Sequence, residues 1–315
     1  MSLRTKLFII FVSVTIILVY LVTMPISGKP DVVIGGKDFT EQSVLGEMLA
    51  ILIEENSDLI VERKLYLGGT MICFNALKSG DLDLYSEYTG TGLVSILDRR
   101  VISDPDQAYS VVKKDFKNKW DMVWLKPFGF NNTYTLTMRK AQADELAIRT
   151  VSDLAARVKK QRQADVDGRL VAGFTAEFIE RPDGYKGLTE AYDFRFAGEP
   201  KQMDPGLMYK ACADGDVDVI CAFGTDGRIA AYDLLTLEDD RGFFPPYYAA
   251  PLIRTQTLAK YPELRDILNR LAGKLDNRTM QELNLQVDRE DNPRQARDVA
   301  RDFLIHHNLA PAGGG

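Results

Sequence analysis

Two segments far apart in the chain carry nearly the same sequence, and this repeat constrains the fold more than any other feature. Gly80-Asp-Leu-Asp-Leu-Tyr85 and Gly215-Asp-Val-Asp-Val-Ile220 match position by position. Apolar residues that alternate with aspartates are typical of a short strand, and a glycine is favoured just past the end of a helix. In both places a helix precedes the strand, and a turn with threonine and glycine follows it. The repeat therefore predicts two similar α/β lobes that face each other across a cleft.

The first lobe begins with three strand–helix units in succession. Strands are expected at 31–36, 59–67 and 82–85, and helices are expected to begin near residues 38–40, 70 and 93. This alternation predicts a parallel, doubly wound layer, in which ligands bind beyond the carboxyl ends of the strands. The glycine pairs 35–36 and 68–69 match neither phosphate-binding fingerprint, so we interpret them as tight turns.

Polar and aromatic side chains gather where the third strand ends. Tyr85, Glu87, Tyr88 and Thr91 fall at the position where a small polar ligand would bind. Residues 89–92 are small, and they leave backbone N–H groups free at the start of the next helix. The alternative is a turn whose tyrosines have no role in binding.

The rest of the chain is expected to build the second lobe and then to return to the first. We expect helices at 107–118, 143–163, 175–181, 203–214, 261–274 and 292–306. We expect strands at 122–125, 135–138, 170–174, 217–221 and 234–238. Crossovers between the lobes are expected near 131–135 and 235–240. Because proline fixes φ, the loop 243–248 would hold Tyr247 at a defined angle, or it would simply cover a sheet edge.

Composition excludes several classes of function. A chain of 315 residues favours two domains, and a net charge of -6 lacks the basic footprint of a nucleic-acid binder. The only two histidines, His306 and His307, are adjacent, and adjacent residues on a helix do not face each other, so we expect no metal site. Cys73, Cys212 and Cys221 lack zinc or redox spacing. A Cys212–Cys221 disulfide stays open for an oxidising compartment.

The N-terminus has the pattern of an export signal. Arg4 and Lys6 precede an apolar run from Leu7 to Val22, which is short for a membrane span. No cysteine follows the run, so a bacterial lipid anchor is excluded. Because the cleavage pattern near Ser27 is poor, residues 1–30 are either a cleaved signal or an anchor in the inner membrane. We expect the protein in the periplasm.

Several motifs spread over residues 31–309 carry a family resemblance. They are Gly36–Gln42, Leu67–Thr70, Asp83–Thr91, Gly129–Tyr134, Glu180–Tyr185, Thr225–Arg228 and Phe243–Pro251. On these motifs the chain resembles the substrate-binding components of bacterial ABC importers for osmoprotectants such as glycine betaine, choline and carnitine.

The resemblance implies a fold and a set of partners. The fold would be α/β, a two-lobed type II periplasmic-binding-protein fold with the ligand cleft between the lobes. Lobe I would comprise residues 31–130 and 240–312, and lobe II would comprise residues 131–239. The protein would act as a monomer, without cofactor, metal or nucleic acid. Its ABC permease and ATPase subunits would be encoded separately.

The resemblance also implies the binding residues. A box of aromatic rings for a trimethylammonium head falls on Tyr88, Tyr134, Phe223 and Tyr247. The residues that would hold the carboxylate of a betaine fall on Lys37, Thr91 and Arg181. A quaternary ammonium has no N–H donor, and the faces of aromatic rings attract it instead, by roughly 0.5–2 kcal/mol per contact.

The sequence contains no recognisable set of catalytic residues. An enzyme would need a nucleophile–base pair, metal ligands or a cofactor motif, and the clustered acids Asp81, Asp83 and Glu87 supply none of these. We therefore predict that the protein is not an enzyme. A binding protein for ergothioneine or another betaine, and a membrane-tethered sensor domain of the same fold, stay open as alternatives.

Overall fold

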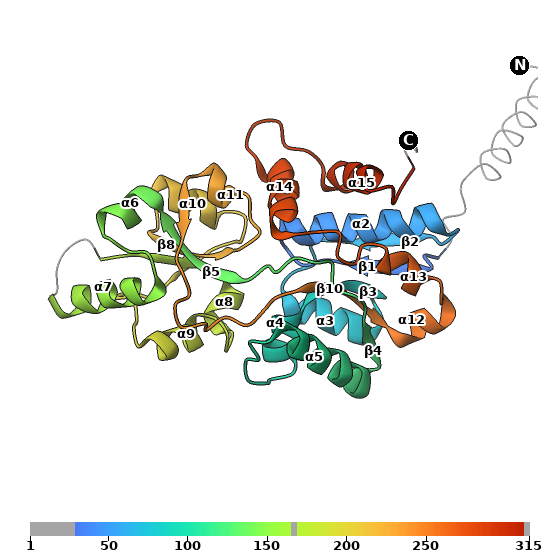
Figure 1. Cartoon of the computed structure of the whole chain (residues 1–315), viewed down its shortest axis with the longest axis horizontal. Coiled ribbons are helices and arrows are strands. Elements are labelled where there is room, and N and C mark those ends of the chain that lie inside the picture. Colours follow the sequence, from blue (N-terminus) through green and yellow to red (C-terminus); the bar gives the residue numbers. More distant parts are fainter. Residues whose placement is uncertain (1–28, 165–168, 312–315) are drawn as a thin grey trace, which may run out of the picture.

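Two α/β lobes lie side by side in the computed structural model, which describes residues 29–164 and 169–311 (Figure 1). Each lobe is built on a five-stranded sheet. The chain enters the second lobe between β4 (Met122–Trp124) and β5 (Tyr134–Arg139), and it returns between β9 (Leu234–Thr236) and β10 (Ala249–Arg254). The predicted two-lobed α/β fold is confirmed. The predicted boundaries at 130–131 and 239–240 fall within these two connections and stay a prediction.

The sheet of the first lobe has the strand order β2-β1-β3-β10-β4. β1 (Val32–Gly35) pairs in parallel with β2 (Val61–Lys64) and β3 (Leu84–Tyr88), as predicted. The predicted parallel layer of the first three strands is present, but β10, which was not predicted, runs antiparallel to both β3 and β4 and makes the whole sheet mixed. The segment was not predicted as a strand because it contains Pro251 and lacks alternation of apolar and polar residues.

Helices cover both faces of this first sheet. They are α2 (Thr40–Asn56), α3 (Thr70–Ser79), α5 (Pro105–Trp120), α12 (Thr255–Lys260), α13 (Leu264–Asn269), α14 (Asn277–Asp288) and α15 (Ala296–His306). α2 is buried on most sides, because it lies between the sheet and α15. The helix expected at 261–274 is present but shorter than predicted, since α13 begins after Pro262 and ends at Asn269. α14 was not predicted, although Asp276 caps its first turn by accepting from Thr279 N at 2.7 Å.

The second sheet repeats the arrangement of the first. Its order is β7-β6-β8-β5-β9, with β6 (Ala172–Phe174) parallel to both β7 (Lys201–Gln202) and β8 (Val219–Phe223). β5 runs antiparallel to β8 and β9. In each sheet, therefore, three parallel strands lie next to one antiparallel strand. This strand is β10 in the first lobe and β5 in the second, and each comes directly after a crossover from the other lobe.

The helices of the second lobe are shorter than predicted. They are α6 (Lys140–Glu145), α7 (Val151–Ala164), α8 (Ala176–Glu180), α9 (Tyr185–Tyr192), α10 (Met208–Asp214) and α11 (Arg228–Ala231). The long helix expected at 143–163 is broken, because Ala147 adopts a φ of 53°. The helix expected at 203–214 begins only at Met208, after Pro205 and Gly206.

The sequence repeat corresponds to a structural repeat. Gly80 ends α3 with φ 91° and Gly215 ends α10 with φ 89°, and only glycine adopts this left-handed backbone readily. The side chain of the second aspartate in each motif then accepts a hydrogen bond from the backbone next to it in the sheet. Asp83 Oδ2 accepts from Val33 N at 2.9 Å, and Asp218 Oδ2 accepts from Val171 N at 2.8 Å.

After β3, the chain forms the short helix α4 (Thr89–Thr91) and then a π-helical turn at Gly92–Ile96. The helix expected at 93–97 is therefore displaced towards the strand. This places Thr91 in the first turn beyond the carboxyl end of β3, beside the gap between the lobes.

Two further expectations concern disulfides and the membrane. Cys73, Cys212 and Cys221 are all free and buried, so the disulfide left open between the last two is not formed. Burial raises the pKa of the Cys212 thiol to about 11. Across residues 29–164 and 169–311, no helix is long and apolar enough to cross a membrane. The apolar run from Leu7 to Val22 lies outside the described residues.

Candidate functional site

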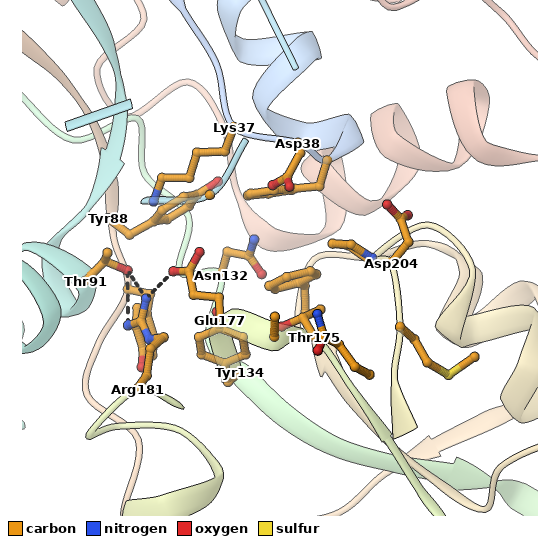
Figure 2. A pocket seen from close by; sticks show the side chains of 18 residues that line it. Lys37, Asp38, Tyr88, Thr91, Asn132, Tyr134, Thr175, Glu177, Arg181 and Asp204 are labelled. Atoms are coloured by element: carbon orange, nitrogen blue, oxygen red, sulfur yellow. Dashed lines mark hydrogen bonds and ion pairs between the residues drawn. The ribbon is translucent and has the colours of Figure 1, made fainter. Parts of the chain in front are cut away.

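A cavity of about 450 Å³ lies between the two lobes (Figure 2). All of the predicted binding residues line it: Lys37, Tyr88, Thr91, Tyr134, Arg181, Phe223 and Tyr247. Lining residues that were not predicted include Asp38, Phe39, Asn132 and Glu177. The volume lies within the range of about 300–1,000 Å³ that is typical of small-molecule sites. The fold thus brings together residues from both lobes that are far apart in sequence.

Two of the aromatic rings occupy equivalent ends of the repeated strands. Tyr88 is the last residue of β3, and Phe223 is the last residue of β8. Phe39, in front of α2, lies between them. Its ring stacks on Phe223 with a centroid separation of 5.0 Å and an interplanar angle of 13°, and it lies 6.3 Å from the ring of Tyr88. A continuous aromatic wall therefore spans both lobes.

Two tyrosines on the connections between the lobes extend this wall. Tyr134 begins β5, and its ring centroid lies 5.4 Å from that of Phe223 and 5.6 Å from that of Tyr247. Tyr247 stands at 88° to Tyr134, while its backbone N–H donates to Asn131 Oδ1 at 2.7 Å. Gly90 permits this approach, since a Cβ there would lie 2.7 Å from the Tyr247 ring. Tyr247 thus lines the cavity rather than merely covering a sheet edge.

Lys37 is buried beside the aromatic wall and is already paired. Its Nζ lies 2.7 Å from Glu87 Oε1 and 3.0 Å from Thr70 Oγ1, and it stands 5.2 Å from the centroid of the Tyr88 ring. Glu87 is fully buried and also accepts from Tyr85 Oη at 2.9 Å. The expected contact between Lys37 and a ligand's carboxylate stays a prediction, and any such contact must compete with Glu87.

Arg181 is held in the same way by carboxylates of the second lobe. Its Nε and Nη2 donate to the two oxygens of Asp183 at 2.8 and 2.6 Å, and its Nη1 donates to Glu177 at 2.9 Å. Across the cleft it donates to Thr91 Oγ1 at 3.3 Å. The guanidinium also lies 5.2 Å from the centroid of the Tyr134 ring. Asp183 in turn accepts from the hydroxyl of Tyr247 at 2.6 Å.

Glu177 is the most informative of the residues that sequence reasoning missed. From α8 in the second lobe it accepts from the N–H and the hydroxyl of Thr70 in the first lobe, at 3.1 and 2.6 Å. Burial acts to raise the pKa of its carboxyl, but the charges of Lys37 and Arg181 and the bonds from Thr70 lower this pKa to about 2. The spacing of Glu177 and Arg181, four residues apart on a predicted helix, was the available signal.

A second buried carboxylate, Glu41, ties the two lobes together behind Tyr88. It accepts from Tyr88 Oη at 2.7 Å, Asn132 Nδ2 at 2.9 Å and Asn284 Nδ2 at 3.2 Å, and also from the Thr225 hydroxyl of the second lobe. Burial raises the pKa of Glu41, while these hydrogen bonds lower it. All four of these donors are neutral, so within the described part of the chain this carboxylate has no cation among its hydrogen-bond partners.

Carboxylates also stand at the far end of the cavity. Asp38 is half-buried there, and Asp204 of the second lobe lines the same end (Figure 2). Burial raises the pKa of Asp38, and the negative charges of Glu177 and Asp204 raise it further. In residues 29–164 and 169–311, no three histidines, cysteines or acidic residues are arranged to hold a metal ion.

A cleft between two α/β lobes, closed by contacts across it and lined with aromatic rings, defines a two-lobed ligand-binding protein. Residues 30–306 match the sequence profile of the family OpuAC, described as the substrate binding domain of ABC-type glycine betaine transport system. The chain belongs to this family and is a substrate-binding component of an ABC importer. The predicted family and function are thereby confirmed.

Individual relatives agree with this assignment. The chain is similar to the carnitine transport binding protein OpuCC of Listeria monocytogenes, with 37% identity over 284 residues, 90% of this chain and 88% of that protein. It is 38% identical to the ergothioneine transport permease/ergothioneine binding protein EgtU of Helicobacter pylori over 89% of this chain and 48% of that protein. A crystal structure of a glycine betaine/carnitine/choline ABC transporter gives a TM-score of 0.70 at 34% identity, covering 88% of this chain and 99% of that one.

Proposed function

We propose that this protein captures a small quaternary amine in the cleft between its lobes and delivers it to the permease of its importer. One observation carries the proposal. The rings of Phe39, Tyr88, Tyr134, Phe223 and Tyr247 line one cavity and lie close to one another around it. Such ring faces attract a cation that has no N–H to donate.

The ligand would lie with its methylated nitrogen against these rings and its oxygen-bearing end towards Thr91, Glu177 and Arg181. Thr91 and Glu177 come from different lobes and meet through Arg181. A ligand bound there would contact both lobes at once and thereby favour the closed arrangement.

The role is binding without catalysis. Glu177, Glu87 and Asp183 are occupied by hydrogen bonds or ion pairs with the protein's own residues. The described cysteines are buried thiols, and burial raises the pKa of Cys73 and Cys221 to about 12. We therefore infer that a bound amine is released chemically unchanged.

Export and assembly follow from the same proposal. The charged and apolar pattern of residues 1–30 would direct the chain across the inner membrane, either as a cleaved signal or as an anchor. The exported protein would work as a monomer with permease and ATPase subunits on separate chains. Determining the N-terminal residue of the exported protein distinguishes cleavage near Ser27 from retention of the whole segment.

A calorimetric titration with a panel of quaternary amines tests the proposal. The panel contains glycine betaine, choline, carnitine and ergothioneine, the last because EgtU of Helicobacter pylori is named for that compound. At least one of them should bind at a stoichiometry of one, and mass spectrometry should recover it unchanged. The proposal is wrong if none of them binds, or if the protein converts the ligand into a product.

A further inference from the structure

The two cations expected to hold a ligand's carboxylate are neutralised by carboxylates of the protein. Lys37 pairs with buried Glu87 at 2.7 Å. Arg181 makes a two-pronged pair with buried Asp183 and a further pair with Glu177 at 2.9 Å. Two-pronged pairs between arginine and a carboxylate are among the stronger charged hydrogen bonds in proteins. An incoming carboxylate would therefore find no unpaired cation among these two residues.

Glu177 itself stands where the carboxylate of a zwitterionic ligand is expected. It accepts from the N–H and hydroxyl of Thr70 and from Arg181, and it lines the cavity. These donors are the type that would otherwise bind the ligand's oxygens. Because Lys37 and Arg181 hold the pKa of Glu177 at about 2 against the effect of burial, this side chain is ionised at neutral pH.

The charges around the aromatic wall are also unbalanced. Beyond the carboxylates paired with Lys37 and Arg181, Glu41 is buried behind Tyr88 with neutral donors as its hydrogen-bond partners. Half-buried Asp38 adds a carboxyl at the far end of the same cavity. The three paired carboxylates Glu87, Asp183 and Glu177 already outnumber the two cations Lys37 and Arg181, and a ligand with a net positive charge restores the balance.

We propose that this site selects quaternary amines that carry a hydroxyl group, such as choline, over those that carry a carboxylate, such as glycine betaine. The inference rests on the proposed function, since it presupposes that a quaternary amine binds in the cleft. A hydroxyl group donates to Glu177, whereas a carboxylate placed there meets a like charge at hydrogen-bonding distance. Like charges brought together at an interface repel each other and weaken binding.

The test compares the affinities for choline and glycine betaine in the full-length protein and in two variants. Glu177→Gln removes the negative charge and keeps an oxygen that accepts from Thr70. Glu180→Gln is the matched control, because Glu180 ends the same helix, is exposed and does not line the cavity. Circular dichroism and thermal unfolding check that each variant is folded.

The parent protein should bind choline more tightly than glycine betaine. Glu177→Gln should shift the ratio of the two affinities by about ten-fold or more towards glycine betaine, and Glu180→Gln should leave the ratio unchanged. The inference is overturned if the parent prefers glycine betaine, or if Glu177→Gln weakens or strengthens both ligands equally. If neither ligand binds the parent but another quaternary amine does, the charge selection is wrong while the proposed function stands. If no quaternary amine binds, both are wrong.

Discussion

The ring and the hydroxyl of Tyr247 have different roles, and two substitutions should distinguish the role of the ring in binding from the role of the hydroxyl in stability. Its ring forms one side of the cavity, and its hydroxyl donates to buried Asp183 at 2.6 Å. Tyr247→Phe keeps the ring but removes a hydrogen bond to a charged group, which typically contributes about 1.5–3 kcal/mol. Because Arg181 still holds Asp183 with two bonds, we expect a loss near the lower end, roughly 1.5 kcal/mol of the free energy of unfolding. Ligand affinity should change little.

Tyr247→Leu should affect both tasks. It removes the same hydroxyl and also the face that attracts the cationic head, a contact worth roughly 1–2 kcal/mol once desolvated. The expected loss of affinity is about five- to thirty-fold beyond that of the phenylalanine variant. Affinity is measured by calorimetric titration with a quaternary amine that binds the parent protein. Stability is measured by thermal unfolding without ligand.

The two variants should differ in ligand affinity but not in the direction of their change in stability. Both should lower the melting temperature, by about 1.5–2 °C per kcal/mol for a chain of 315 residues. Only the leucine variant should lose affinity. Equal affinities for the two variants would refute the role of the ring, and an unchanged melting temperature in the phenylalanine variant would refute the role of the hydroxyl.

Three further expectations follow from the structure. Ligand binding should lower the radius of gyration in solution scattering, since the lobes meet across the cleft through Thr70 and Glu177, and an unchanged profile at saturation would speak against a hinge. Gly90→Ala should reduce affinity several-fold while the protein stays folded, because its Cβ would press on the Tyr247 ring at 2.7 Å, and parent-like affinity would contradict this. Glu177 should contribute stability above about pH 4.5 that is lost as the pH falls towards its folded pKa of about 2, so Glu177→Gln should flatten the pH dependence of the unfolding free energy in this window. Identical pH profiles would argue against an ionised, paired Glu177.

Much of the architecture could be predicted because the same local signals occur twice. The glycine–aspartate motifs mark a helix end followed by a strand, and these signals depend only on residues close in sequence. They predicted strands at 82–85 and 217–221, which correspond to β3 and β8, whereas Phe223 as a site residue came from the family resemblance. β10 and α14 were missed since their stability comes from packing against distant parts of the chain. β10, for example, pairs with both β3 and β4.

The residues that line the cavity were predicted better than their ion-pair partners. The family resemblance placed Lys37 and Arg181 at the cavity, and the structure places them there too. That both would be neutralised by Glu87, Asp183 and Glu177 could not be read from sequence, because an ion pair depends on side-chain directions in the folded state. Phe39 was missed for a related reason. It lies just before α2, and the rings that it contacts, Tyr88 and Phe223, are far from it in sequence.

The central claim is that the aromatic rings of the cleft bind a positive charge rather than merely an apolar shape. Titration with choline and with 3,3-dimethylbutan-1-ol, its neutral carbon analogue of nearly the same shape, tests this most directly. Several ring contacts of roughly 0.5–2 kcal/mol each predict that choline binds at least about ten-fold more tightly than the neutral analogue. Choline binding that is no tighter than binding of the analogue would contradict the account.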